Sequence, residues 1–125
     1  PTESELAILK VLWENEPCTV RLVNDKLNES RKTEKEIGYT TTLKLMQIMT
    51  EKGILKRTID GRKHIYESVT EQSETQSVLV EDLVKSAFGG SAMNLVMQAL
   101  GNHETSQEEL EKIKALIKSK ETKND

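Results

Sequence analysis

The stretch GYTTTLKLMQIMTEKGILKRTIDGRKHIYESV, residues 38–69, predicts a helix that is followed directly by a β-hairpin. In its first half, large apolar residues and one threonine recur at helical spacing and predict a single buried helix face. These residues are Thr42, Leu45, Met46 and Met49. Gly53 is typical of the position just beyond a helix C-terminus, because glycine adopts positive φ at no steric cost.

The second half of the stretch carries the hairpin signal. Asp60-Gly61 is a typical two-residue hairpin turn, since both residues tolerate positive φ. The β-branched residues on either side of it predict two strands, which we place at Ile54 to Ile59 and at Arg62 to Val69.

Two further helices are expected before this stretch. Thr2 and Glu5 have the spacing of a capping box, so a first helix is expected from Thr2 to Glu14. Thr19 is a typical N-cap for a second, short helix. Three helices and a basic hairpin make the winged helix-turn-helix pattern of a DNA-binding domain, which we place at residues 1–70.

Residues 71–125 predict three more helices, which we interpret as a dimerisation domain. Each carries a one-sided apolar stripe, and three short helices are too small to bury these stripes among themselves. Pairing with a second copy would bury these stripes. A two-fold dimer would also present two copies of the helix that follows Gly38, as recognition helices, to a palindromic operator. The expected dimer anchors are Phe88, Leu95, Leu100, Leu110, Ile113 and Ile117. The fold class expected for the chain is therefore mainly α with a small β-hairpin.

Composition narrows the class of protein. The 125 residues include one cysteine, Cys18, so an internal disulfide is excluded and a cytoplasmic location is expected. No apolar run approaches the roughly 20 residues of a membrane span, so no membrane insertion is expected. The net charge is −3, but the window from Arg31 to His64 holds nine basic and four acidic residues, a net of +5. Such a window favours a nucleic-acid partner, with a plain solvated face as the alternative.

The residues needed for catalysis are scarce. The two histidines, His64 and His103, are far apart in the sequence, and no phosphate-binding glycine loop or metalloprotease motif occurs. One cysteine cannot supply the several Cys or His ligands of a zinc or copper site. We therefore expect no enzyme activity, no metal and no cofactor.

The start of the predicted helix after Gly38 is the first expected DNA contact. Thr40, Thr41 and Lys44 occupy its outward side, where hydroxyls and free backbone N–H groups can bind phosphate. Two neighbours have open alternatives. Leu43 contacts either a thymine methyl group or the edge of the core, and Tyr39 donates to a phosphate or braces the helix start.

The hairpin provides the second expected DNA contact. Basic or potentially basic side chains bracket its turn and favour phosphate contacts, whose affinity would fall steeply with salt. They are Arg57, Arg62, Lys63 and His64. A merely soluble hairpin is the alternative. The corresponding alternative function is a protein-interaction adaptor that has kept a winged-helix scaffold without DNA contacts, which the acidic C-terminal half would suit.

Several segments resemble the penicillinase-repressor family of bacterial regulators. They include TESELAILKVLW, TVRLVNDKL, GYTTTLKLMQIMTEKG, the wing GRKHIYE and AFGGSAMNLVMQAL. The most specific are the recognition-helix pattern and the phenylalanine and Gly-Gly-Ser corner. The resemblance covers nearly the whole chain and implies a homodimeric winged-helix repressor that binds a palindromic operator in double-stranded DNA.

Two branches of the family sense signals through residues that differ here. The copper-responsive branch uses paired Cys-X-Cys motifs near its C-terminus, a region without cysteine in this chain. The β-lactam-responsive branch is inactivated by proteolysis at an Asn-Phe bond, and the matching position here is Gln98-Ala99. The resemblance thus implies a signal-dependent release such as proteolysis, with a membrane sensor protease as a further partner and Gln98-Ala99 as the candidate cleavage region.

Overall fold

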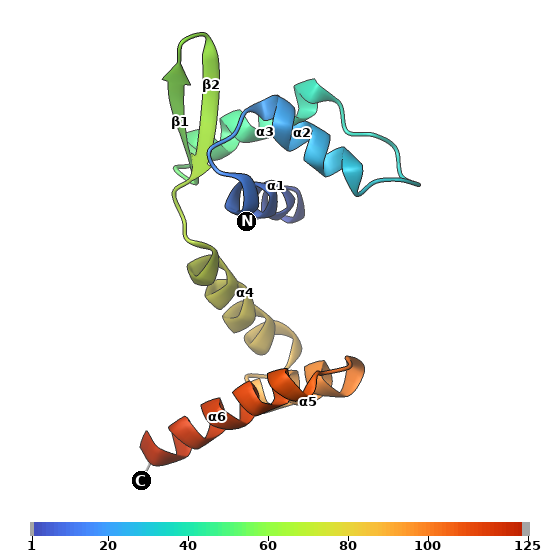
Figure 1. Ribbon diagram of the computed structural model, residues 1–125, viewed down its shortest axis with the longest axis vertical. Coiled ribbons are helices and arrows are strands. Elements are labelled where there is room, and N and C mark those ends of the chain that lie inside the picture. The colour runs from blue at the N-terminus through green and yellow to red at the C-terminus, as the bar shows by residue number, and fades with distance from the viewer. Residues whose placement is uncertain (1, 124–125) are drawn as a thin grey trace. The chain divides into compact units, whose positions relative to one another are not determined.

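The computed structural model describes residues 2–123, and within them the chain forms helices and one antiparallel hairpin (Figure 1). This confirms the expected fold class, a winged helix followed by a helical C-terminal region. The elements, in chain order, are α1 (Glu3–Asn15), α2 (Val20–Glu29), α3 (Tyr39–Glu51), β1 (Leu55–Asp60), β2 (Lys63–Ser68), α4 (Gln72–Ala87), α5 (Ala92–Asn102) and α6 (Gln107–Lys123).

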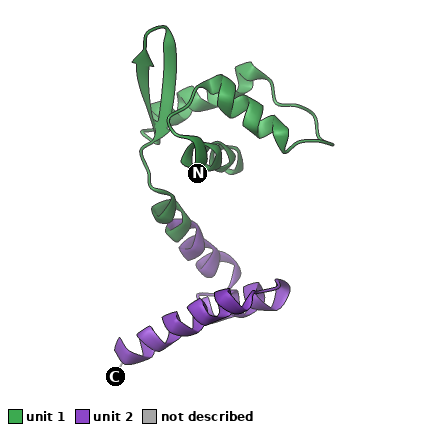
Figure 2. Ribbon diagram, viewed as in Figure 1, with its two compact units in different colours: residues 1–77 green, residues 78–125 purple. Residues whose placement is uncertain are grey.

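The chain divides into two compact units, residues 1–77 and residues 78–125 (Figure 2). The division falls within α4, several residues beyond the boundary at residue 70 that the sequence suggested. The domain boundary at residue 70 stays a prediction.

Local sequence signals explain where the first helices begin. Thr2 caps α1, and the capping box is complete, because Thr2 Oγ1 accepts the N–H of Glu5 at 3.1 Å and Glu5 Oε1 accepts the N–H of Thr2 at 3.0 Å. Thr19 caps α2 through a bond from the N–H of Leu22 at 3.2 Å. Both caps confirm the sequence prediction. They satisfy backbone donors that a helix start leaves unpaired.

The first unit has a continuous apolar core between α1, α2, α3 and the base of the hairpin. Its buried residues include Ile8, Leu9, Leu12, Cys18, Val20, Val23, Leu27, Met46, Met49, Leu55 and Tyr66. Thr42 is also fully buried, as the helical spacing predicted. Leu45, in contrast, is only half-buried at the core's edge.

The turn between α1 and α2 adds a short third segment to the hairpin. Cys18 and Tyr66 form an antiparallel bridge, in which the N–H of Tyr66 donates to the Cys18 carbonyl at 2.8 Å and the N–H of Cys18 donates to the Tyr66 carbonyl at 3.1 Å. The indole N–H of Trp13 donates to the Thr70 carbonyl at 3.1 Å. The hairpin is thereby fastened to the helices at its base.

The hairpin turn lies one residue later than predicted. Asp60 pairs with Lys63, so the two-residue loop is Gly61-Arg62 and not Asp60-Gly61. Gly61 has φ of +66°, whereas no residue other than glycine has positive φ among those described. This pattern is that of a type II′ turn, which needs positive φ only at its first central residue. The first strand is accordingly one residue later than predicted, and the second strand is one residue shorter at each end.

The second unit contains little that is buried. Ser91 caps α5, and Ser106 and Glu109 form a reciprocal pair at the start of α6. However, no residue of α5 or α6 is buried within the described part of the chain. In residues 2–123, no helix combines the length and apolarity that a membrane crossing requires.

Candidate nucleic-acid interface

The outward side of α3 carries the side chains that the sequence singled out. Thr40, Thr41 and Lys44 are exposed, and Tyr39 is 40% exposed. Thr42 faces the core and is fully buried. The three consecutive threonines therefore divide into two that face solvent and one that packs inside.

A groove of about 560 Å³ lies between the start of α3 and the hairpin. It brings together six of the nine residues predicted to contact DNA, and these are Tyr39, Leu43, Arg57, Arg62, Lys63 and His64. The remaining three, Thr40, Thr41 and Lys44, are exposed on α3 but do not line the groove. No Asp or Glu among residues 2–123 lines it, so the charged side chains of this lining are all basic or potentially basic.

Leu43 lies at the edge of the core, which was one of its two alternatives, and its contact with DNA stays a prediction. Its side chain is half-buried and packs against the core cluster, and it also lines the groove. Leu45, two residues later, packs against the same core but does not reach the groove. The pair therefore separates a groove-lining leucine from a purely structural one on the same helix.

Arg21 is a groove residue that the sequence analysis did not identify. It lies on α2, and its guanidinium carbon is 4.7 Å from the centroid of the Tyr39 ring. A cation at this distance is attracted by the negative face of the ring. Tyr39 thus braces the start of α3 against α2, while the Arg21 charge is added to the groove. The sequence held no signal for this pair, because the two residues are brought together only by the packing of α2 on α3.

The hairpin register shows which wing residues face the same way. Arg57 pairs with Tyr66 and Ile59 pairs with His64, and directly opposed residues share one face of the sheet. Since Arg57, Tyr66 and His64 line the groove, this face is the one turned toward α3. Ile59 extends the same face toward the hairpin tip and is 61% exposed.

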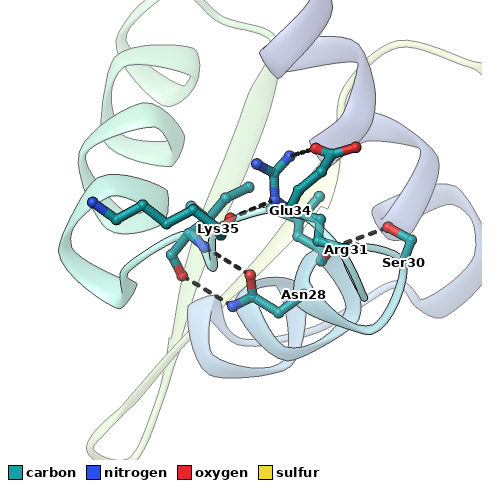
Figure 3. A network of polar contacts seen from close by, with 7 residues as sticks. Asn28, Ser30, Arg31, Glu34 and Lys35 are labelled. Carbon is teal, nitrogen blue, oxygen red and sulfur yellow. Dashed lines mark hydrogen bonds and ion pairs between the residues drawn. The ribbon is translucent and has the colours of Figure 1, made fainter.

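The loop between α2 and α3 is held by polar contacts (Figure 3). Arg31 Nε donates to the Lys35 carbonyl at 3.0 Å, and Arg31 Nη1 pairs with Glu34 at 3.0 Å. The guanidinium of Arg31 is therefore engaged within the loop. Asn28, also shown in Figure 3, accepts the N–H of Ile37 through Oδ1 at 2.8 Å and donates to the carbonyl of the same residue at 2.9 Å.

The other end of α3 is held by an ion pair. Lys52 Nζ lies 3.0 Å from Glu5 Oε2, and the Glu5 side chain is 5% exposed. The bond from the Thr2 backbone, together with Lys52, lowers the pKa of Glu5 below its ordinary value of 4.5. Glu5 therefore serves twice, because it closes the α1 capping box and anchors the C-terminal end of α3.

The thiol of Cys18 is buried beneath the hairpin. Burial, with a smaller effect from the Glu16 carboxylate, raises its pKa from 9.0 to about 11. Such a thiol is protonated near neutral pH and is a poor nucleophile. Among residues 2–123, no group of three or more His, Cys, Asp or Glu side chains is arranged to hold a metal ion.

The expected dimer anchors divide into two sets. Phe88, Leu95, Leu110 and Ile113 are half-buried within the single chain. Leu100 and Ile117 remain exposed, at 36% and 51%. The second unit also exposes apolar side chains that were not among the expected dimer anchors. These include Val80, Leu83, Met93, Val96, Met97 and Leu116.

The candidate cleavage region lies in the middle of a helix. Gln98 and Ala99 are both exposed on α5, and Gln98 Oε1 accepts a bond from Asn102 at 3.4 Å. The peptide bond between them is therefore part of a regular helix.

Known bacterial proteins are similar to this chain in sequence. Residues 1–119 match the family model described as penicillinase repressor. A protein of Mycobacterium tuberculosis (strain H37Rv) described as transcriptional regulator BlaI is 31% identical over 84 residues, which cover 66% of this chain. That match spans only 58% of the length of the mycobacterial relative. A protein of Bacillus licheniformis described as penicillinase repressor is 22% identical over 116 residues, covering 93% of this chain and 88% of the relative.

Proposed function

The chain belongs to the penicillinase repressor family, and from this we propose that it is a transcriptional repressor that binds a palindromic operator in double-stranded DNA as a homodimer. The observation that carries the proposal is the groove between α3 and the hairpin. Its charged lining is basic or potentially basic, in a chain whose net charge is −3. Local positive charge of this kind suits a polyanion, whereas the chain as a whole would be repelled by one.

In this proposal α3 is the recognition helix and enters the major groove. Thr40, Thr41 and Leu43 lie near the base edges, where a threonine or leucine methyl group can contact the C5-methyl of thymine. Lys44 binds the phosphate backbone. The hairpin is the wing, and its Arg57, Arg62, Lys63 and His64 follow the sugar-phosphate chain beside the recognition helix.

A gel-shift titration against the promoter upstream of the chain's own gene tests DNA binding. The wild-type protein should shift this duplex at low salt, and Arg57→Glu with Arg62→Glu should abolish the shift. Lys118→Glu on α6 is the control, since it also reverses a positive charge but lies outside the groove. If folded wild-type dimer shifts no duplex at low salt, the proposed function is wrong. If the double variant still binds, the wing is not a contact.

Lys44→Ala gives a quantitative check of the same interface. Loss of one phosphate contact should weaken binding to every duplex alike and reduce the slope of log K against log salt by about one unit. Filter binding or fluorescence anisotropy at several salt concentrations measures the slope. An unchanged slope would remove Lys44 from the phosphate contacts.

The homodimer is supported by the apolar surface of the second unit. Exposed apolar side chains occur on each of its helices, including Leu83 on α4, Val96 on α5 and Ile117 on α6. A monomer that left these residues in water would forgo the burial of apolar surface that stabilises small domains. Pairing with a second copy buries them and doubles the number of recognition helices.

Signal-dependent release, such as proteolysis, completes the proposal. Gln98-Ala99 is the candidate cleavage region, and a membrane sensor protease is the partner that would deliver the signal. Because the bond lies within α5, cleavage requires local unwinding of the helix before a protease can bind an extended chain. Mass spectrometry of the protein from induced cells tests this proposal. Fragments that end at Gln98 would support it, and intact protein on a derepressed promoter would contradict it.

A further inference from the structure

We propose that Asn24 and Asn28 are positioning residues for the start of α3, and that they control operator specificity without touching DNA. This inference rests on the proposed function. It assigns to α2 a role in discrimination between DNA sequences that goes beyond its general support of the recognition helix.

The two asparagines form one network with the chain that leads into α3. Asn28 binds both backbone polar groups of Ile37, the N–H at 2.8 Å and the carbonyl at 2.9 Å. Asn24 Nδ2 donates to the same carbonyl at 3.0 Å and to Thr42 Oγ1 at 2.8 Å. The network therefore joins α2 to a residue before α3 and to a residue in its first turns.

The hydrogen bond between Asn24 and Thr42 is the buried part of this network. Asn24 is 6% exposed, and Thr42 is fully buried. Throughout the described residues, no buried side-chain nitrogen or oxygen lacks a hydrogen-bond partner. Removing the Asn24 amide would leave the buried Thr42 hydroxyl without its donor, and removing the Asn28 amide would leave the Ile37 N–H without its acceptor. Either loss is more costly than that of an exposed bond.

The start of α3 depends on this network because it lacks a side-chain N-cap, which commonly fixes the first turn of a helix. Its N-cap is Gly38, and no side chain caps the helix there. Both α1 and α2, in contrast, begin with a threonine cap. The position of the first turn of α3 is thus set from outside, by the fixation of Ile37 and Thr42.

Small shifts of this turn would affect base contacts and phosphate contacts differently. A hydrogen bond or methyl contact to a base edge tolerates a few tenths of an ångström, since useful N–H···O distances span about 2.7–3.2 Å. Attraction between a lysine and a phosphate changes only over the Debye length of about 8–10 Å. A loosened α3 should therefore lose operator preference while it keeps most of its non-specific affinity.

The test compares Asn28→Ala with Asn15→Ala. Asn15 is a matched control, because it is also a half-buried helical asparagine with a side-chain bond to backbone, from Nδ2 to the Val11 carbonyl at 2.8 Å, and it does not line the groove. Each protein is titrated against the best duplex that the wild type selects from a random library and against a scrambled duplex, at one salt concentration and well below the unfolding temperature.

Asn28→Ala should lower affinity for the selected duplex by about tenfold to a hundredfold, the range of one lost base contact. Its affinity for the scrambled duplex, and both affinities of Asn15→Ala, should stay within about twofold of wild type, since phosphate attraction is little changed by small shifts. If the ratio of the two affinities is unchanged in Asn28→Ala, the asparagines are only structural and the inference is wrong. If the wild type binds no duplex, the proposed function fails as well.

Amide hydrogen exchange provides a readout that needs no DNA. Asn28→Ala should speed exchange at Ile37 and Thr42 and leave the amides of α1 unchanged. Asn28→Asp serves where the alanine variant does not fold, because it still accepts the Ile37 N–H but no longer donates to the carbonyl. In Asn28→Asp, amide exchange at Ile37 and at Thr42 should also be faster than in wild type, but by less than in Asn28→Ala. Exchange at Ile37 and Thr42 equal to that of wild type would overturn the inference.

Discussion

Leu43 packs on the core and also lines the groove, so under the proposed function it contributes both to stability and to recognition of DNA. Leu43→Ala should therefore have two effects. The free energy of unfolding should fall by about 1–2 kcal/mol, as expected for truncation of a half-buried leucine. Preference at one thymine position of the operator should also relax.

Leu45→Ala separates these effects. It removes the same atoms from a leucine that packs on the core but does not reach the groove. It should lower stability and leave base preference as in the wild type. Chemical denaturation and binding to a set of single-base operator variants measure the two quantities. Equal base preferences in the two variants would place Leu43 with the core alone.

Cys18 gives a prediction about reactivity. A pKa of about 11 in place of 9.0 implies roughly a hundredfold less thiolate near pH 8. Alkylation of the folded protein by iodoacetamide at pH 8 should be slower than that of the denatured protein by at least this factor. A variant with Cys18→Ser and Thr122→Cys is the control, since Thr122 is exposed and its cysteine should react rapidly in both states. Rapid labelling of folded wild type would contradict burial of the thiol.

At the scale of single elements, the ion pair between Glu5 and Lys52 fastens α3 to α1, and its contribution should depend on pH. The pKa of Glu5 is lowered in the folded protein, so the folded state binds fewer protons than the unfolded state near pH 4. Stability from Glu5 is then present above pH 4.5 and is lost as the pH falls through the lower folded value.

Glu5→Gln tests this sign. At neutral pH the variant should be less stable than wild type by about 1 kcal/mol, a modest value because Lys52 is half exposed and the pair is screened by solvent. The difference should shrink as the pH falls below 4.5. Urea denaturation at pH values from about 3 to about 7, which span the titration of a carboxyl group, measures this difference in stability. The control is Glu14→Gln, which changes an exposed residue of the same helix. A difference that stays constant over this range would exclude the ionised carboxylate as its cause.

The elements that the sequence predicted well are those whose signals are local. The caps at Thr2 and Thr19 were predictable because in each a side chain binds a backbone N–H only three residues away. The hairpin was placed correctly, but its turn was shifted by one residue. Asp-Gly favours a turn with positive φ at both residues, whereas pairing of Asp60 with Lys63 selected Gly61-Arg62.

The residues that the sequence did not reveal depend on packing between helices. Arg21 meets Tyr39, and Asn24 meets Thr42, only because α2 lies against α3. Asn24 and Asn28 are four residues apart on one face of α2, but a pair of asparagines at that spacing also fits a solvated helix surface. Half-burial of Phe88, Leu95, Leu110 and Ile113 within one chain was likewise not predicted.

At the scale of the whole molecule, operator affinity should depend on the second unit even though the groove lies in the first. Two recognition helices held in one dimer convert the second binding event into an intramolecular one, which raises affinity by about 10²–10⁴ without any new contact. A charge placed on the proposed dimer surface should remove this gain and leave the fold of the first unit intact.

Ile117→Glu tests the dependence, because Ile117 is 51% exposed on α6 and its burial against a second copy would bury the new carboxylate. Ala115→Glu is the control, since it adds the same charge to an exposed residue on the other side of the helical wheel. Analytical ultracentrifugation should show a monomer for Ile117→Glu and a dimer for Ala115→Glu. Affinity for a full operator should fall by about 10²–10⁴ in the first variant alone, with affinity for a half-site unchanged in both. Full-operator affinity that survives in a monomeric Ile117→Glu protein would show that one α3 and one wing suffice, and that the second unit has some purpose other than pairing two recognition helices.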